Sequence, residues 1–130
     1  MADLFQNSSI PVLEQLVNFT QARHTALAGN IANIDTPGYV ARDLSVEDFR
    51  KQLREAVHDH RPTSMNSDHS STALAQVSKN PKSILFHDKS QVGVEHQVTE
   101  MVKNRIEHNT ALAIMASQFQ LLQTAISEKL

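Results

Sequence analysis

Ten residues at the end of a long helical pattern read Asn30-Ile31-Ala32-Asn33-Ile34-Asp35-Thr36-Pro37-Gly38-Tyr39. Proline disfavours the helical conformation of the residue before it and has no backbone N–H, so we expect the helix to end by about Asp35. Pro37-Gly38 is typical of the centre of a type II turn, because proline sets φ at the first central position and glycine accepts the positive φ of the second. Asn30 and Asn33, three residues apart, indicate a polar, closely packed contact at this helix end.

The residues before the turn predict a long N-terminal helix over 9–35. Ser8 or Ser9 can cap it, and Pro11 fits its first turn. Apolar positions alternately three and four residues apart form a heptad seam, the pattern of helices packed as in a coiled coil. The seam of this helix consists of Ile10, Leu13, Val17, Thr20, His24, Leu27, Ile31 and Ile34.

A second heptad pattern predicts a C-terminal helix over 94–127. Its seam consists of Val94, Val98, Met101, Arg105, His108, Leu112, Met115, Phe119, Leu122 and Ile126. Ile114, Leu121 and Ala125 add a second apolar face to the last half of this helix, which therefore needs more than one partner surface. The two matching patterns predict an all-α fold in one domain, 1–130, with the terminal helices packed as a coiled-coil-like hairpin.

The middle of the chain carries weaker signals. A turn motif over 36–45 leads into a short amphipathic helix over 46–57, where Ser45 and Asp48 resemble the ends of a capping box. The apolar face of this helix consists of Val46, Phe49, Leu53 and Val57. Residues 58–92 lose periodicity and are rich in serine, so we expect a flexible, largely disordered segment with at most a short strand at Ile84-Leu85-Phe86.

Composition excludes several classes of function. The formal net charge is −2 without a basic cluster, so nucleic acid is not an expected partner. The absence of cysteine excludes disulfides and thiol chemistry. No apolar run approaches the roughly 20 residues of a membrane span. The N-terminus lacks a basic region followed by an apolar core, so no cleaved secretory signal is expected.

The run over 27–43 resembles the N-terminal signature of the flagellar axial proteins, the family of rod, hook and hook-associated subunits. Asn30-Ile31-Ala32-Asn33 and Thr36-Pro37-Gly38-Tyr39 carry the resemblance, and Ala41-Arg42-Asp43 is most similar to the proximal rod member. Near the other end, Glu100-Met101-Val102-Lys103 and Ser117-Gln118-Phe119 resemble the C-terminal helix of the family. Two departures are Gly93-Val94-Glu95, in place of an Asn-x-Val-Asp-like helix start, and His108-Asn109, in place of an aromatic-Gln pair.

The resemblance implies a structural subunit of the proximal rod of the bacterial flagellar basal body, in the periplasm. Family members are exported unfolded by the flagellar type III export apparatus without signal cleavage. Their terminal helices pack together in a tube that transmits torque and lines the export channel. The implied partners are copies of the chain, other flagellar rod subunits, the membrane-ring protein and the ring-rod adaptor. No cofactor and no small-molecule substrate are implied.

The expected assembly motif consists of Asn30, Ile31, Ala32, Asn33, Thr36, Pro37, Gly38 and Tyr39. On a helix Asn33 lies about 200° from Ile31, away from the seam. It either bonds a neighbouring subunit, with Gly29 and Ala32 allowing close approach, or simply caps the helix; the resemblance favours the neighbour. The polar seam residues Thr20, His24, Arg105 and His108 either meet, if the helices are antiparallel, or face solvent or the tube lumen.

Two other classes of function are an enzyme and a binding module. An enzyme is not expected, because the chain has no Gly-rich phosphate loop, no Gly-x-Ser-x-Gly and no cysteine. His58-Asp59-His60 and His69 carry zinc-binding groups, but they lack further spaced ligands, so no metal is expected. The alternative that stays open is a soluble helical adaptor or chaperone-like binding module that uses the same apolar stripes to hold a partner.

Overall fold

The computed structural model describes residues 9–59, 76, 79, 82–83 and 93–128. The elements, in chain order, are α2 (Ile10–Ala32), β1 (Arg42–Asp43), α3 (Val46–Asp59), β2 (Lys82–Ser83) and α5 (Val94–Ser127). The predicted all-α fold with long terminal helices is confirmed. Within the described ranges, no helix combines the length and the apolar character that crossing a membrane requires.

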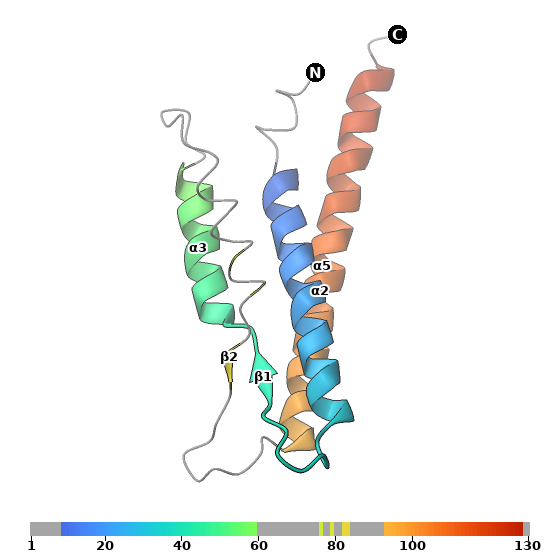
Figure 1. Cartoon of the computed structure of the whole chain (residues 1–130). Coiled ribbons are helices and arrows are strands. Elements are labelled where there is room, and N and C mark those ends of the chain that lie inside the picture. The colour runs from blue at the N-terminus through green and yellow to red at the C-terminus, as the bar shows by residue number, and fades with distance from the viewer. Residues whose placement is uncertain (1–8, 60–75, 77–78, 80–81, 84–92, 129–130) are drawn as a thin grey trace.

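The helices α2 and α5 lie side by side and run in opposite directions, while α3 lies along another side of α2 (Figure 1). The C-terminal end of α2 is level with the start of α5, so the two form the predicted hairpin. The lengths differ, since α2 has 23 residues and α5 has 34. At about 1.5 Å per residue, the last part of α5 extends roughly 16 Å beyond the first residue of α2.

The face that α5 turns toward α2 differs from its predicted seam. The buried residues of the two helices at the hairpin interface are Leu13, Thr20, Arg23, Leu27 and Asn30 on α2 and Gln97, Asn104 and Ala111 on α5. Met101 and His108 of the predicted seam are half-buried beside them, but Val98, Leu112 and Phe119 are 44, 42 and 48% exposed. The helix is turned by about half a residue step, or roughly 50°, from the predicted setting.

A cluster of buried apolar side chains joins α2 to α3. Phe19 of α2 stacks on Phe49 of α3, with ring centroids 4.0 Å apart and ring planes 10° from parallel. Leu44 and Ala56 are buried in the same cluster. The apolar face of α3 follows the predicted pattern as far as Leu53 and then uses Ala56, whereas the predicted Val57 is 56% exposed.

The segments around α3 are tied down locally. The Asp48 backbone N–H donates to Ser45 Oγ at 3.2 Å, as the predicted helix cap requires. The strands β1 and β2 pair antiparallel, with Arg42 opposite Ser83 and Asp43 opposite Lys82. The prediction of a flexible segment over 58–92 lies almost wholly outside the described residues, as does the strand predicted at Ile84-Leu85-Phe86.

Candidate functional site

The predicted turn follows α2. The helix ends at Ala32, and the Asn33 side-chain Nδ2 donates to the Gly29 carbonyl at 2.8 Å. Within the chain Asn33 therefore caps the helix, the simpler of its two interpretations. The Tyr39 N–H donates to the Thr36 carbonyl at 3.1 Å and Gly38 has φ +76°, the bond and the angle of the predicted type II turn.

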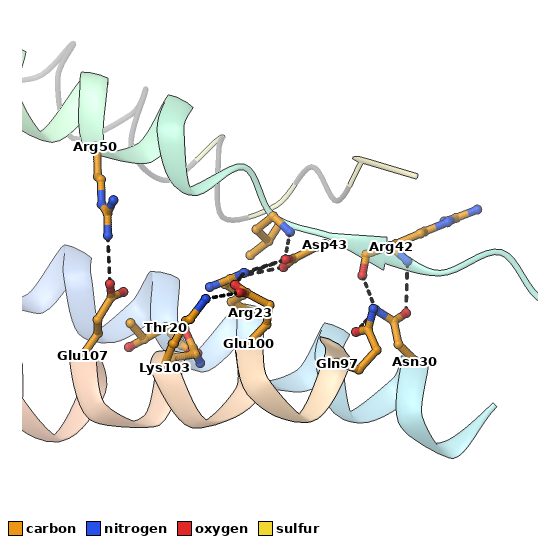
Figure 2. A network of polar contacts seen from close by, with 12 residues as sticks. Thr20, Arg23, Asn30, Arg42, Asp43, Arg50, Gln97, Glu100, Lys103 and Glu107 are labelled. Atoms are coloured by element: carbon orange, nitrogen blue, oxygen red, sulfur yellow. Dashed lines mark hydrogen bonds and ion pairs between the residues drawn. The ribbon is translucent and has the colours of Figure 1, made fainter. Parts of the chain in front are cut away.

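Asn30 is the centre of the hydrogen-bond network that holds the turn against both helices, and it is 2% exposed. Its Oδ1 accepts from the Tyr39 hydroxyl at 3.1 Å and from the Arg42 N–H at 3.0 Å. Its Nδ2 donates to the Arg42 carbonyl at 2.7 Å and to Gln97 Oε1 at 3.1 Å (Figure 2). These four bonds use the whole capacity of a primary amide, so Asn30 fixes the turn, β1 and the start of α5 together.

A cluster of four charged side chains lies next to this network. It is about two turns from Asn30 along α2 and about one turn from Gln97 along α5. Arg23 of α2 is 5% exposed and pairs with Asp43 of β1 at 2.7 Å and with Glu100 of α5 at 2.8 Å. Lys103 Nζ lies 2.8 Å from the other oxygen of Glu100 (Figure 2). Two cations and two carboxylates balance, so the buried guanidinium is compensated.

The cluster favours the charged forms of Glu100 and Arg23. Hydrogen bonds from Lys103 and Arg23 lower the pKa of Glu100 from its ordinary value, against the opposing effect of burial. For Arg23, burial on its own disfavours the charge, but the bonds to Asp43 and Glu100 outweigh it and raise the pKa. The charged forms of Arg23 and Glu100 are therefore the ones that connect α2, β1 and α5.

A third polar contact lies near the middle of the hairpin. Asn104 Nδ2 donates to the Thr20 carbonyl at 2.8 Å, and Thr20 Oγ1 lies 2.8 Å from His108 Nδ1. The hydroxyl also lies 2.9 Å from the Leu16 and Val17 carbonyls, so it can donate to either. The predicted meeting of polar seam residues occurs for Thr20 and His108, while His24 and Arg105 are exposed.

The structure divides the predicted site residues by burial. Asn30 of the motif is buried; Ile31, Asn33 and Tyr39 are half-buried; Ala32, Thr36, Pro37 and Gly38 are exposed. Of the predicted seam, those buried or half-buried are Ile10, Leu13, Val17, Leu27, Ile34, Met101, Met115 and Leu122. Those exposed are Val98, Leu112, Phe119 and Ile126.

Sequence reasoning missed the residues that carry most of the polar contacts, namely Arg23, Asp43, Gln97, Glu100 and Asn104. A signal for some of them exists, because Arg23 and Asn30 are seven residues apart and so are Gln97 and Asn104. A heptad spacing of polar residues one position from an apolar heptad marks a second possible seam. Asp43 has no such signal, since only the turn brings it to Arg23.

No group of three or more His, Cys, Asp or Glu side chains in the described ranges is placed to hold a metal ion. Of the histidines weighed as zinc ligands, His58 is exposed near the end of α3. His60 and His69 lie outside the described residues. The arrangement of Asn30, Arg23 and their partners positions helices against one another.

No protein-family model matches the chain. Known proteins are nevertheless similar over most of its length. It is 32% identical over 113 residues to the flagellar basal body rod protein FlgB of Aeromonas hydrophila, covering 80% of this chain and 81% of that one. It is 29% identical over 126 residues to FlgB of Aquifex aeolicus (strain VF5), covering 95% of each. It is 24% identical over 127 residues to FlgB of Bacillus subtilis (strain 168), covering 93% of this chain and 95% of that one.

Proposed function

Because this chain belongs to the family of the flagellar basal body rod protein FlgB, we propose that it forms the proximal rod by self-assembly and by co-assembly with other rod subunits. Family membership makes it a structural protein of the rod of the flagellar basal body. The proposal adds how it assembles: α2 and α5, the helices at the two ends of the chain, supply the contact surfaces. The resemblance of the turn motif to that of the proximal rod member supports a place for this chain in the proximal part of the rod.

The exposed apolar surface of α5 is the observation that supports this assembly. The large apolar side chains exposed on this helix are Val94, Val98, Val102, Ile106, Leu112, Ile114, Phe119, Leu121 and Ile126. They lie on more than one side of the helix, because Ile106 and Leu121 are not on the face that carries Val98 and Leu112. A helix that is apolar on several sides needs more partners than a single hairpin supplies.

The remaining parts of the proposal rest on the resemblance to the axial proteins. In this proposal the assembled hairpins transmit torque and line the export channel, and the neighbours include the membrane-ring protein and the ring-rod adaptor. The subunit reaches the periplasm through the type III export apparatus without a cleaved signal. The buried ion pairs and hydrogen bonds between α2, β1 and α5 support the torque-bearing part, because they oppose sliding and rotation of one helix against the other.

The test compares two substitutions that place one negative charge on α5. Ile106 is 61% exposed, and Asn109 is exposed three residues further along. Ile106→Asp should leave the helical hairpin intact and abolish concentration-dependent association, because it puts a charge into an apolar contact between subunits. Asn109→Asp is the matched control and should have the weaker effect.

Circular dichroism and sedimentation over a range of concentrations provide the readout. For the unsubstituted chain we expect helicity to rise with association, since a subunit completes its fold through neighbours. Normal association of Ile106→Asp would contradict the assigned surface. A fully helical, cooperative monomer at all concentrations would instead favour the adaptor or chaperone-like module.

A further inference from the structure

The hairpin interface is polar at three successive levels, although each helix carries an apolar heptad beside it. We call these levels the polar layers. They consist of Asn30 with Gln97, Arg23 with Glu100, and Thr20 with Asn104 and His108. Each layer joins α2 to α5 by at least one direct hydrogen bond. Figure 2 shows those of Asn30 with Gln97 and of Arg23 with Glu100.

A pairing of α2 and α5 through the polar layers buries fewer apolar side chains than a pairing through the neighbouring heptad would. Asn104 is 1% exposed, and in the described part of the chain its Oδ1 has no hydrogen-bond partner. A buried, unpaired acceptor lowers stability relative to an apolar side chain of similar size. Immediately beside the interface of α5, Val98 and Leu112 continue the apolar heptad but remain exposed.

Two rotational settings of the hairpin are therefore encoded in the chain. Both use Met101 and His108 of α5; the observed setting adds Gln97, Asn104 and Ala111, and the alternative adds Val98, Arg105 and Leu112. The two differ by a rotation of about 50°, half the angle between successive residues. The alternative would bury more apolar surface, and it would also bring Arg105 toward the interface.

We infer that the polar layers determine the rotational setting of α2 on α5 and so keep α2 from covering Val98 and Leu112. Rotation of α5 would separate Asn30 Nδ2 from Gln97 Oε1, the one bond of the Asn30 side chain that reaches α5. It would also separate Arg23 from Glu100 of α5 and leave the guanidinium with Asp43 of β1 as its carboxylate partner. Mispairing thus leaves several buried polar groups without partners, which is how polar residues at a helix interface select one arrangement.

The function of this setting rests on the assembly proposed above, because Val98 and Leu112 serve neighbours only while they stay exposed. The setting itself is a property of the single chain. It can be measured without any rod, so failure of the inference and failure of the assembly proposal are distinguishable.

The absence of native cysteine allows a direct experiment. A single thiol is introduced by Ala111→Cys or by Leu112→Cys, and its rate of alkylation is measured in the full chain at low concentration. Ala111 is 1% exposed and Leu112 is 42% exposed, so these neighbours report opposite settings. In the otherwise unsubstituted chain, the thiol at 112 should react at least about tenfold faster than the thiol at 111, because a buried thiol reacts only through local opening.

The same two thiols are then measured in a chain carrying Arg23→Ala and Asn104→Ala, which removes groups from two polar layers and leaves Asn30 intact. We expect the ratio of the two rates to invert, with position 112 protected and position 111 reactive. The matched control carries Arg54→Ala and Asn109→Ala, the same residue types at exposed positions of α3 and α5. This control should keep the original ratio.

Two results would overturn the inference. An unchanged ratio in the Arg23→Ala, Asn104→Ala chain would show that apolar packing alone determines the setting. Rates at both positions equal to those of the urea-unfolded chain would show that the polar layers are required for the hairpin to form, without choosing between settings. The single Asn104→Ala chain, which disturbs the hairpin less, should show a partial shift of the ratio in the same direction.

Discussion

Arg23 and Asp43 meet at two points, with Nε 2.9 Å from Oδ1 and Nη2 2.7 Å from Oδ2. This bidentate contact joins the middle of α2 to β1, on the far side of the Pro37-Gly38 turn. Oδ1 of the same carboxylate also accepts the Leu44 N–H at 2.7 Å. The two segments that flank the turn, α2 and β1, are therefore held together by a charged pair. The bidentate geometry of this pair requires an arginine.

Removing the guanidinium should destabilise the chain strongly. Arg23→Met keeps the length of the side chain but leaves Asp43 and Glu100 without their shared cation, and we expect a loss of about 3 kcal/mol in the free energy of unfolding. Urea titration followed by circular dichroism measures it. Arg50→Met is the control, because the Arg50 pair with Glu107 is exposed and should contribute less than about 1 kcal/mol. Equal losses for the two variants would contradict the role given to burial.

The hydrogen bonds of Asn30 can be tested with little change of shape. Asn30→Asp retains one acceptor but replaces the donor to the Arg42 carbonyl and to Gln97 with a second acceptor, and should lower the free energy of unfolding by about 2–4 kcal/mol. Asn33→Asp loses one half-buried bond to Gly29 and should lower it by about 1 kcal/mol. Chemical denaturation of both variants decides the order. A larger loss of unfolding free energy for Asn33→Asp than for Asn30→Asp would contradict the central role given to Asn30.

Substitution by alanine should have different effects at Gly38, in the turn, and at Gly93, before α5, although both positions have room for a Cβ. Among the described residues, a Cβ added at Gly38 or at Gly93 would have no atom within 4 Å beyond those of the adjacent residues. Of the two residues, only Gly38 has a positive φ, +76°. Gly38→Ala should therefore destabilise by about 1–2 kcal/mol through backbone strain alone. Gly93→Ala, at φ −56°, should change stability by less than about 0.5 kcal/mol. Thermal unfolding of the two variants compares them, and similar midpoints would rule out the strained turn.

The charged cluster predicts a specific response to acid. The pKa of Glu100 is lowered in the folded chain, so its contribution to stability is complete above the ordinary glutamate pKa of about 4.3 and is lost as pH falls through the folded value. Glu100→Gln should be less stable than the parent at pH 7, and the difference should narrow below about pH 4. Urea midpoints at several pH values measure the gap.

Glu14→Gln, which removes an exposed acid of α2, is the control for the loss of one negative charge. It should change the urea midpoint at pH 7 much less than Glu100→Gln does. A gap between Glu100→Gln and the parent that stayed constant down to pH 3 would mean that the carboxylate contributes by its shape alone.

Local chemistry predicts much of this fold. Pro37 and Gly38 determine a turn by their own backbone preferences, and the structure has the predicted hydrogen bond and φ angle there. The two heptads predict two long helices that pair as a hairpin, which the structure confirms. These features depend on residues close in sequence, where propensity and spacing suffice.

The rotational setting could not be predicted from apolar spacing. Asn104 meets Thr20 across 84 positions of sequence, and each of these residues alone counts against burial. Periodicity is assessed one helix at a time, so it assigns the interface to Val98 and Leu112 in preference to their neighbours Gln97 and Ala111. Burial of a polar side chain becomes favourable only when its partner is known, and that depends on tertiary pairing.

The unequal lengths of α2 and α5 have a mechanical consequence. The two helices are level at the turn end of the hairpin, so roughly 16 Å of α5 extends past the first residue of α2, for 34 and 23 residues. If such hairpins are stacked end to end along the helix direction, that length of α5 spans the interval between one α2 helix and the next. In a shaft built this way each α5 helix would carry twist across that interval.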